Sequence, residues 1–159
     1  MDFFRQVENL VHRYAEMIDG GDFDGLGGLF ARGSVHFVPG GLSIHGAKEV
    51  TRFYEKSIVI DGATGTPGTV HWVSNLIIQG DAEGLLSRSR YRVTLNVGGE
   101  PPRLIATGRY FDHFFIEDSQ VYFSQRRVVS EYIGDTSGHL RQGLFTVAAN
   151  GSEHDVRRR

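Results

Sequence analysis

The chain has 159 residues, a length typical of one domain, and its 17 Lys and Arg nearly balance its 19 Asp and Glu. The net charge of −2 argues against a protein that binds nucleic acid or an anionic membrane surface by charge. Hydrophobic residues make up 40% of the chain and charged residues 23%, so the composition is that of a folded protein. Cysteine is absent, which excludes disulfides, thiolate metal sites and a cysteine nucleophile.

The expected location is the cytoplasm, with no part of the chain in a membrane. The first residues, MDFFRQVENLVHRY, place Asp2 and Glu8 within an amphipathic pattern and lack the basic and then apolar layout of a signal peptide. No apolar run approaches the length of about 18 residues that a membrane-spanning helix needs. A chain without cysteine is compatible with the reducing cytosol.

The N-terminal third of the chain predicts three helices and one strand. Over residues 3–18, apolar side chains recur at steps of three and four, which is typical of an amphipathic helix capped by Asp2. A short second helix is expected over residues 22–29, a strand over 34–38 and a third helix over 46–57.

After a glycine-rich loop over residues 61–68, the period of the apolar residues changes from 3.6 to 2, which indicates β-strands. The strand over 85–96 alternates cleanly, so Arg88, Arg90 and Arg92 are expected on its exposed outer face. There they would pair with solvent or with acidic groups of a neighbouring subunit. The expected strands cover residues 69–79, 85–96, 103–115 and 120–133.

Helices followed by long strands with short turns indicate an α+β fold with a curved antiparallel sheet. Three helices on the concave face of such a sheet would leave a conical hollow. A single domain is expected over residues 1–150, and the final GSEHDVRRR, residues 151–159, is expected to form a charged and solvated tail.

Asp19 and His71 are the leading candidates for chemistry. Asp19 closes the first helix, where a carboxylate opposes the helix dipole, and His71 lies among apolar residues of a strand. Taken singly, Asp19 could begin a solvated glycine turn, and His71 could be a hydrogen-bonded core residue. If the helix covers the inner face of that strand, the carboxylate can hold one ring N–H and leave the other nitrogen as a general base.

Three blocks of the sequence resemble the SnoaL-like branch of the NTF2-like superfamily. They are YAEMIDGGDFDGL at residues 14–26, HWVSNL at 71–76, and GRYFD at 108–112 followed by QRRV at 125–128. Their order and spacing agree over residues 5–135, almost the whole chain. The resemblance implies a cone-shaped α+β barrel in which three N-terminal helices pack on a curved, mixed and mainly antiparallel sheet.

Within that superfamily, scytalone dehydratase, bile acid 7α-dehydratase and hexachlorocyclohexane dehydrochlorinase are similar at Asp19 and His71. The resemblance implies an Asp–His dyad in which the histidine takes a proton from carbon during an elimination. Tyr14 matches the spacing of a catalytic tyrosine in the bile acid enzyme, whereas the catalytic tyrosine of scytalone dehydratase falls at Ile18. The arginine that the bile acid enzyme contributes from its last strand falls at Ser130, so the resemblance implies a shared mechanism more than a shared substrate.

Further side chains are expected to line the hollow, each with a structural alternative. Asn75 follows His71 by four residues, so it could orient the histidine or the substrate, or make a structural hydrogen bond. Tyr14 and Tyr110 could instead be core aromatics. The expected substrate-binding residues are Asn75, Tyr110, Phe30, Phe53, Tyr54 and Trp72.

The remaining polar residues are expected to be structural. Arg109, Asp112 and Arg126 are expected to form an ion network at the surface or at the rim of the hollow, where it adds little stability. No trio of His, Asp and Glu has the spacing of metal ligands, so no metal is expected. No glycine-rich phosphate loop precedes a helix, so no nucleotide or other cofactor is expected.

The leading hypothesis is a cofactor-independent dehydratase or related lyase, in which Asp19, His71 and Tyr14 act on a hydrophobic aromatic, steroid-like or polyketide-like molecule. One alternative is a ketosteroid-isomerase-like isomerase or polyketide cyclase that uses the same hollow. Another is a non-catalytic binding or assembly module, for which the hollow would be filled or Asp19 would lie far from His71. Apolar residues on the outer face of a curved sheet also favour a homo-oligomer, and the resemblance implies either a dimer or a trimer.

Overall fold

Every helix and strand expected from the sequence is present in the computed structural model, with ends that agree within two residues. The structure describes residues 2–81, 84–96 and 98–141, so the expected domain end at residue 150 and the tail over 151–159 lie outside the described residues. Along the chain the elements are α1 (Phe3–Gly20), α2 (Phe23–Leu29), β1 (Ser34–Val38), β2 (Leu42–His45), α3 (Gly46–Ser57), β3 (Thr69–Asp81), β4 (Gly84–Leu95), β5 (Arg103–Glu117) and β6 (Gln120–Ile133).

Local chemistry sets both ends of α1. The Asp2 carboxylate accepts a hydrogen bond from the Arg5 N–H at 3.0 Å, which caps the first turn as expected. Gly21 follows the helix at φ 73°, a left-handed conformation that favours glycine. The buried stripe of α1 consists of Val7, Val11, Tyr14, Ala15 and Ile18.

No helix within the described ranges is long and apolar enough to cross a membrane.

The strands form one mixed sheet in the order β2–β1–β6–β5–β4–β3. Neighbouring strands are antiparallel except β1 and β6, which run parallel. The sequence analysis missed β2 because its four residues, of which only Ile44 is buried, are too short to show a period. The two edge strands, β2 and β3, do not pair with each other, so the sheet does not close into a barrel. The sheet is mixed, as expected, and is curled but open.

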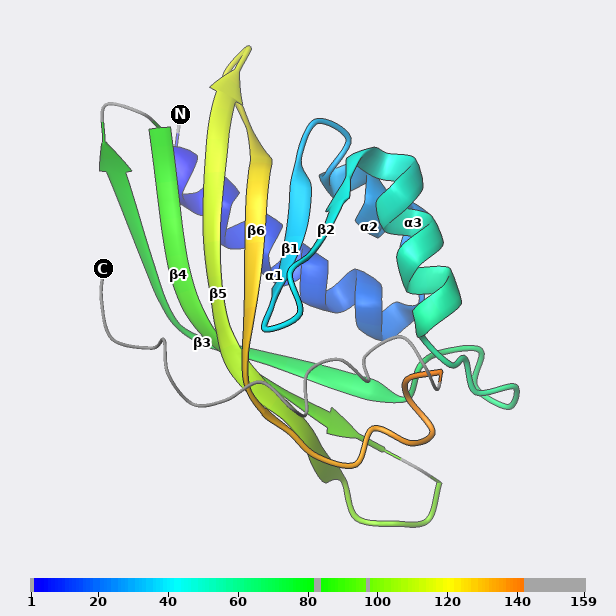
Figure 1. Cartoon of the computed structure of the whole chain (residues 1–159). Helices are drawn as coiled ribbons and strands as arrows, with labels where there is room; N and C mark the ends of the chain where they lie inside the picture. Colours follow the sequence, from blue (N-terminus) through cyan, green and yellow to red (C-terminus); the bar gives the residue numbers. More distant parts are fainter. Residues whose placement is uncertain (1, 82–83, 97, 142–159) are drawn as a thin grey trace.

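Irregular pairing bends the long strands around the helices. The register of β3 against β4 shifts between Ser74 and Ile77, and β5 and β6 shift at two places. At one of these, a Cβ on Gly108 would collide with the Val129 carbonyl oxygen and the Tyr91 ring. Figure 1 shows the result: the sheet curls around one side of α1, and α2 and α3 pack next to each other beyond it.

Residues 134–141, here called the return segment, pass back from the end of β6 toward α3 (Figure 1). The Val59 N–H donates to the His139 carbonyl oxygen at 2.8 Å, and the Arg141 N–H donates to that of Ser57 at 2.8 Å. Leu140 forms an isolated bridge with Ile58. These backbone contacts tie the return segment to the connection between α3 and β3, an arrangement that the sequence did not predict.

The arginines of β4 are exposed on the outer face of the sheet, as expected. Solvent or acidic groups of a neighbouring subunit were the expected partners, but Arg90 pairs with an acidic residue of its own chain. Arg90 makes a salt bridge of 3.2 Å to Glu131 of β6. Arg109 of β5 also binds Glu131, at 2.6 Å. Both pairs are partly exposed, so they add little to stability. The other two exposed arginines are Arg88 and Arg92.

Candidate active site

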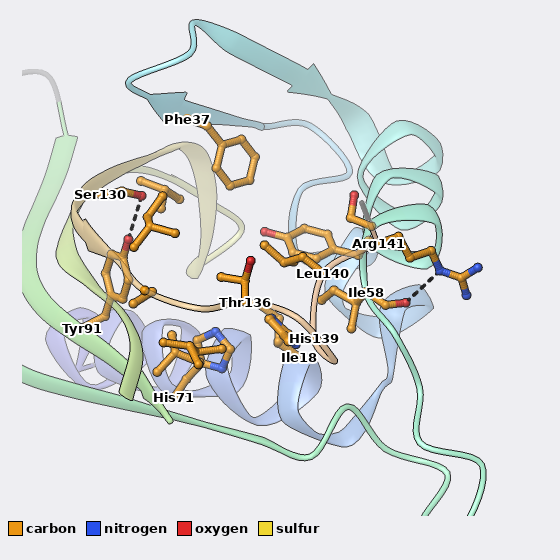
Figure 2. A pocket seen from close by; sticks show the side chains of 18 of the residues that line it. Ile18, Phe37, Ile58, His71, Tyr91, Ser130, Thr136, His139, Leu140 and Arg141 are labelled. Atoms are coloured by element: carbon orange, nitrogen blue, oxygen red, sulfur yellow. Dashed lines mark hydrogen bonds between the residues drawn. The ribbon is translucent and has the colours of Figure 1, made fainter. Parts of the chain in front are cut away.

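A cavity of about 780 Å³ lies between the helices and the concave face of the sheet, within the range of small-molecule sites. Its walls come from α1, α3, β1, β3 to β6 and the return segment. Figure 2 shows side chains from these elements converging on the cavity. Six aromatic side chains line it: Tyr14, Phe37, Phe53, Tyr54, Tyr91 and Tyr110.

The Asp19 carboxylate contacts the His71 imidazole at the edge of this cavity. Oδ1 of Asp19 lies 2.6 Å from Nδ1 of His71 and accepts a hydrogen bond from the Thr69 hydroxyl at 2.8 Å. Oδ2 accepts from the backbone N–H of His71 at 2.7 Å. The side chains of His71 and Asp19 are 8% and 22% exposed, so both are shielded from water. Because Nδ1 faces the carboxylate, Nε2 is the nitrogen that can face a ligand.

The local sequence explains why these two groups meet. Asp19 lies in the last turn of α1, and the left-handed Gly21 ends the helix beside the start of β3. Thr69 and His71 are two residues apart on β3, so their side chains share one face of the strand. Three hydrogen bonds from β3 satisfy the carboxylate and offset its unfavourable position at the helix C-terminus.

A cluster of buried tyrosines forms a second polar group in the cavity lining. The hydroxyls of Tyr14 and Tyr54 lie 2.5 Å apart. Burial raises the pKa of both phenols, and for Tyr14 the nearby Arg126 guanidinium partly offsets this rise. Tyr91 donates to or accepts from Ser130 at 3.1 Å, and burial raises its pKa to about 12. These phenols therefore stay protonated near neutral pH and can donate to a ligand.

The prediction of an ion network at the surface or rim is wrong for Asp112 and Arg126, because the side chains of both residues are 0% exposed. Arg126 donates to Asp112 through Nε at 2.8 Å and through an Nη at 2.7 Å. Its guanidinium carbon lies 4.1 Å from the ring centre of Tyr14 and 4.2 Å from that of Tyr110. The pair is buried because both residues lie on the inner face of the sheet, behind the tyrosines, whereas Arg109 faces outward.

Of the expected site residues, Tyr14, Tyr54, Phe53 and Tyr110 line the cavity with His71. Each projects from the buried side of its helix or strand, as the periodicity predicted.

The expectation that Trp72, Asn75 and Phe30 line the cavity is not met. Trp72 is 53% exposed on the outer face, because it follows His71 directly and successive strand residues point to opposite faces. Asn75 is exposed at φ 54°, within the irregular part of β3, so a spacing of four no longer keeps it on the face of His71. Phe30 lies in the core behind Tyr14, where it stacks on Phe123 at 4.8 Å.

Several lining residues were missed by the sequence analysis. Tyr91 shares the inner face of the alternating β4, and that alternation was a sufficient signal. Ser130 lines the cavity on β6. Thr136 and His139 belong to the return segment, which carries no periodic pattern and so gave no signal. Within the residues that the structure describes, no cluster of three His, Asp or Glu side chains could hold a metal ion.

Three helices on a curled sheet, with a cavity between the layers, define an NTF2-like protein. The family model for the SnoaL-like domain matches residues 4–127, and the chain belongs to this family. A search of the curated proteins found no match.

Solved structures share the fold at low sequence identity. ActVI-ORFA from Streptomyces coelicolor is 16% identical with a TM-score of 0.67, covering 82% of this chain and 98% of its own. A putative scytalone dehydratase from Novosphingobium aromaticivorans is 22% identical with a TM-score of 0.64, covering 83% and 86%. LinA is 15% identical with a TM-score of 0.64, covering 84% and 89%.

Proposed function

We propose that this protein is a cofactor-independent lyase of the dehydratase type that acts on a hydrophobic ring compound. One observation carries the proposal: an imidazole held by a carboxylate at 2.6 Å faces a cavity lined mainly by aromatic and aliphatic side chains. The solved structures named for scytalone dehydratase and LinA have the same fold, which is compatible with elimination chemistry.

The arrangement fits proton abstraction from carbon by His71. Asp19 fixes the tautomer with hydrogen on Nδ1, so the lone pair of Nε2 is directed to the ligand. When Nε2 takes a proton from a carbon next to a carbonyl, the Asp19 carboxylate stabilises the resulting imidazolium. The C–H electron pair forms the new C=C bond, and the C–O bond of a neighbouring hydroxyl breaks. That hydroxyl leaves as water with the proton from Nε2, which restores neutral His71.

Tyr14 is proposed to polarise the substrate carbonyl. Its hydroxyl lies 2.5 Å from that of Tyr54, so when Tyr54 donates to Tyr14, the Tyr14 proton is free for a substrate oxygen. The raised pKa of both phenols, caused by burial, keeps these protons in place. A hydrogen bond from Tyr14 strengthens as negative charge develops on the carbonyl oxygen.

The same tyrosine pair favours a second candidate function, an isomerase or polyketide cyclase. An enolate formed by His71 and held by Tyr14 could be reprotonated at another carbon or could attack a second carbonyl. The two candidates differ in the mass of the product, because elimination loses water and isomerisation does not. A purely structural module has less support, because the cavity is open and Asp19 contacts His71.

The dyad is tested by His71→Ala and Asp19→Asn. Each is expected to lower turnover by about 10²–10⁴-fold, the usual contribution of acid–base catalysis, while circular dichroism stays unchanged. The assay uses a panel of two-ring β-hydroxy ketones, including a hydroxytetralone, which gives a naphthol on loss of water. Product mass separates elimination from isomerisation.

The matched control is His113→Gln, because His113 is an exposed histidine on β5 outside the cavity lining. This variant is expected to keep full activity. Normal turnover in both dyad variants would reject the dyad, and a panel in which no compound is converted by the wild type would reject the proposed substrate class.

We also propose that the protein assembles into a homo-oligomer through the outer face of the sheet. Trp72 and Tyr132 are 53% and 51% exposed, and they lie in one row across β3, β4, β5 and β6. Leu104, which is 45% exposed, pairs with Thr94 next to this row. Exposed apolar groups clustered on one face favour burial against a second copy.

A further inference from the structure

His139 is a second histidine in the cavity, outside the contact between Asp19 and His71. It belongs to the return segment, lines the cavity and is only 7% exposed. Figure 2 shows it beside Ile18 and near His71. The proposed mechanism gives it no part.

The backbone of His139 is fully engaged, so its position does not depend on its side chain. Its carbonyl oxygen accepts from the Val59 N–H at 2.8 Å, and its own N–H donates to the Thr136 carbonyl oxygen at 3.0 Å. Two residues later, the Arg141 N–H donates to Ser57 at 2.8 Å. The imidazole is thereby held in the wall of the cavity by contacts that a substitution of the side chain leaves in place.

The Nδ1 atom of His139 is buried, and no group of the described residues makes a hydrogen bond to it. A buried polar atom without a partner destabilises a protein by about 1–3 kcal/mol, and buried histidines are normally hydrogen-bonded. A purely structural imidazole would have such a partner. His139 lines the cavity, but Nδ1 itself has no exposed surface, so the imidazole must turn about its Cβ–Cγ bond before a molecule bound there can supply the missing partner.

The charge of His139 restricts which partner fits. Burial and the neighbouring His71 lower the pKa of His139 to about 4, and Asp19 opposes this only in part. The ring is therefore neutral near pH 7 and carries one donor and one acceptor nitrogen. A hydroxyl matches either tautomer because it both donates and accepts, whereas a carboxylate only accepts and therefore fits only the tautomer that carries hydrogen on Nδ1.

We propose that His139 is a substrate-binding residue whose Nδ1 hydrogen bonds a hydroxyl group on the ring compound. The substrate then carries two oxygen functions: one beside Tyr14 and His71, where chemistry is proposed, and one beneath the return segment. The position of the first oxygen, beside Tyr14 and His71, rests on the proposed function. The hydrogen bond between the second oxygen and His139 concerns substrate binding and does not depend on the reaction.

Affinities for dihydroxynaphthalenes and dihydroxyanthracenes, each compared with its monohydroxy counterpart, test this contact by calorimetry. In the wild type, the second hydroxyl is expected to tighten binding of at least one pair by about 5- to 20-fold, as one hydrogen bond does. His139→Leu is expected to abolish this preference, and His139→Asn, which keeps a polar atom near Nδ1, to restore part of it. His113→Gln is the control and is expected to keep the full preference.

A measurement on the wild type covers the case in which His139→Leu does not fold. The ¹⁵N resonance of Nδ1 in His139, assigned by its absence in His139→Asn, is expected to shift when a preferred diol is added but not when naphthalene is added. The inference is overturned if no diol is preferred, if His139→Leu keeps the preference, or if the resonance does not respond to the diol.

The same titrations in His71→Ala separate this inference from the proposed function. A diol preference that depends on His139 and survives in His71→Ala supports the contact even if every ketone in the activity panel is left unconverted. Active wild-type enzyme without such a preference would support the proposed function and reject the contact.

Discussion

At the scale of single residues, Arg126 and Asp112 place two opposite charges in the interior. Burying charges is costly, and here two hydrogen bonds and the faces of Tyr14 and Tyr110 surround the guanidinium. The pair thus supports the tyrosines from behind. Its removal should affect both the stability of the core and the placement of the Tyr14 hydroxyl.

Asp112→Asn is expected to lower the free energy of unfolding by about 3–5 kcal/mol, because it leaves the Arg126 charge buried without a counterion. Urea denaturation followed by circular dichroism measures the change. The double variant Asp112→Leu with Arg126→Met removes both charges and is expected to recover most of the loss. Arg32→Met, which breaks the exposed pair with Glu117, is expected to change little. A single variant as stable as the wild type would contradict this account.

At the scale of elements, the return segment forms part of the cavity wall. It contributes Thr136 and His139 to the lining, and backbone hydrogen bonds, the Ile58–Leu140 bridge and a hydrogen bond from Arg141 Nε to the Ile58 carbonyl oxygen at 3.4 Å hold it to the end of α3 and the residues that follow. Because His139 is buried and neutral, its protonation should weaken the attachment of this segment. Burial lowers the pKa of its ring most, and of the neighbouring charged groups His71 lowers this pKa further and Asp19 raises it.

The burial of His139 predicts a pH dependence of stability. The pKa is about 4 in the folded chain against an ordinary value of 6.5, so between these values the unfolded chain binds the extra proton. Above pH 6.5 the neutral ring of His139 costs the folded chain no stability. As the pH falls toward 4, the free energy of unfolding decreases, because the unfolded chain takes up the proton first. Urea denaturation across this window is expected to show a loss on the order of 2–3 kcal/mol that is absent in His139→Leu. Parallel profiles for the two proteins would contradict the prediction.

At the scale of the whole molecule, the curl of the sheet creates a concave face that holds the cavity and a convex face that remains exposed. The concave face is covered by α1, α2, α3 and the return segment (Figure 1). The convex face keeps Trp72, Leu104 and Tyr132 uncovered within one chain. The proposed active site and the proposed oligomer interface therefore lie on opposite faces of the same strands.

Light scattering after size-exclusion chromatography is expected to give the mass of two or three chains. Trp72→Glu places a charge in the exposed apolar row and is expected to shift the protein to monomers, because a buried unpaired charge disfavours the interface. The control is Phe4→Ser, which alters a 51% exposed aromatic residue on α1. A wild-type monomer would reject assembly, and an oligomer unaffected by Trp72→Glu would place the interface elsewhere.

The amino-acid sequence by itself determined every element except β2, and the α+β class, because apolar periodicity and turn residues act locally. It also singled out Asp19 and His71, since each stands next to a clear structural boundary or strand face. Tertiary structure alone decided that Asn75 points away, that Arg126 and Asp112 are buried, and that His139 enters the cavity. These outcomes depend on a strand irregularity, on the curl of the sheet and on the path of the return segment. Contacts between residues far apart in the chain set all three, and no local pattern encodes them.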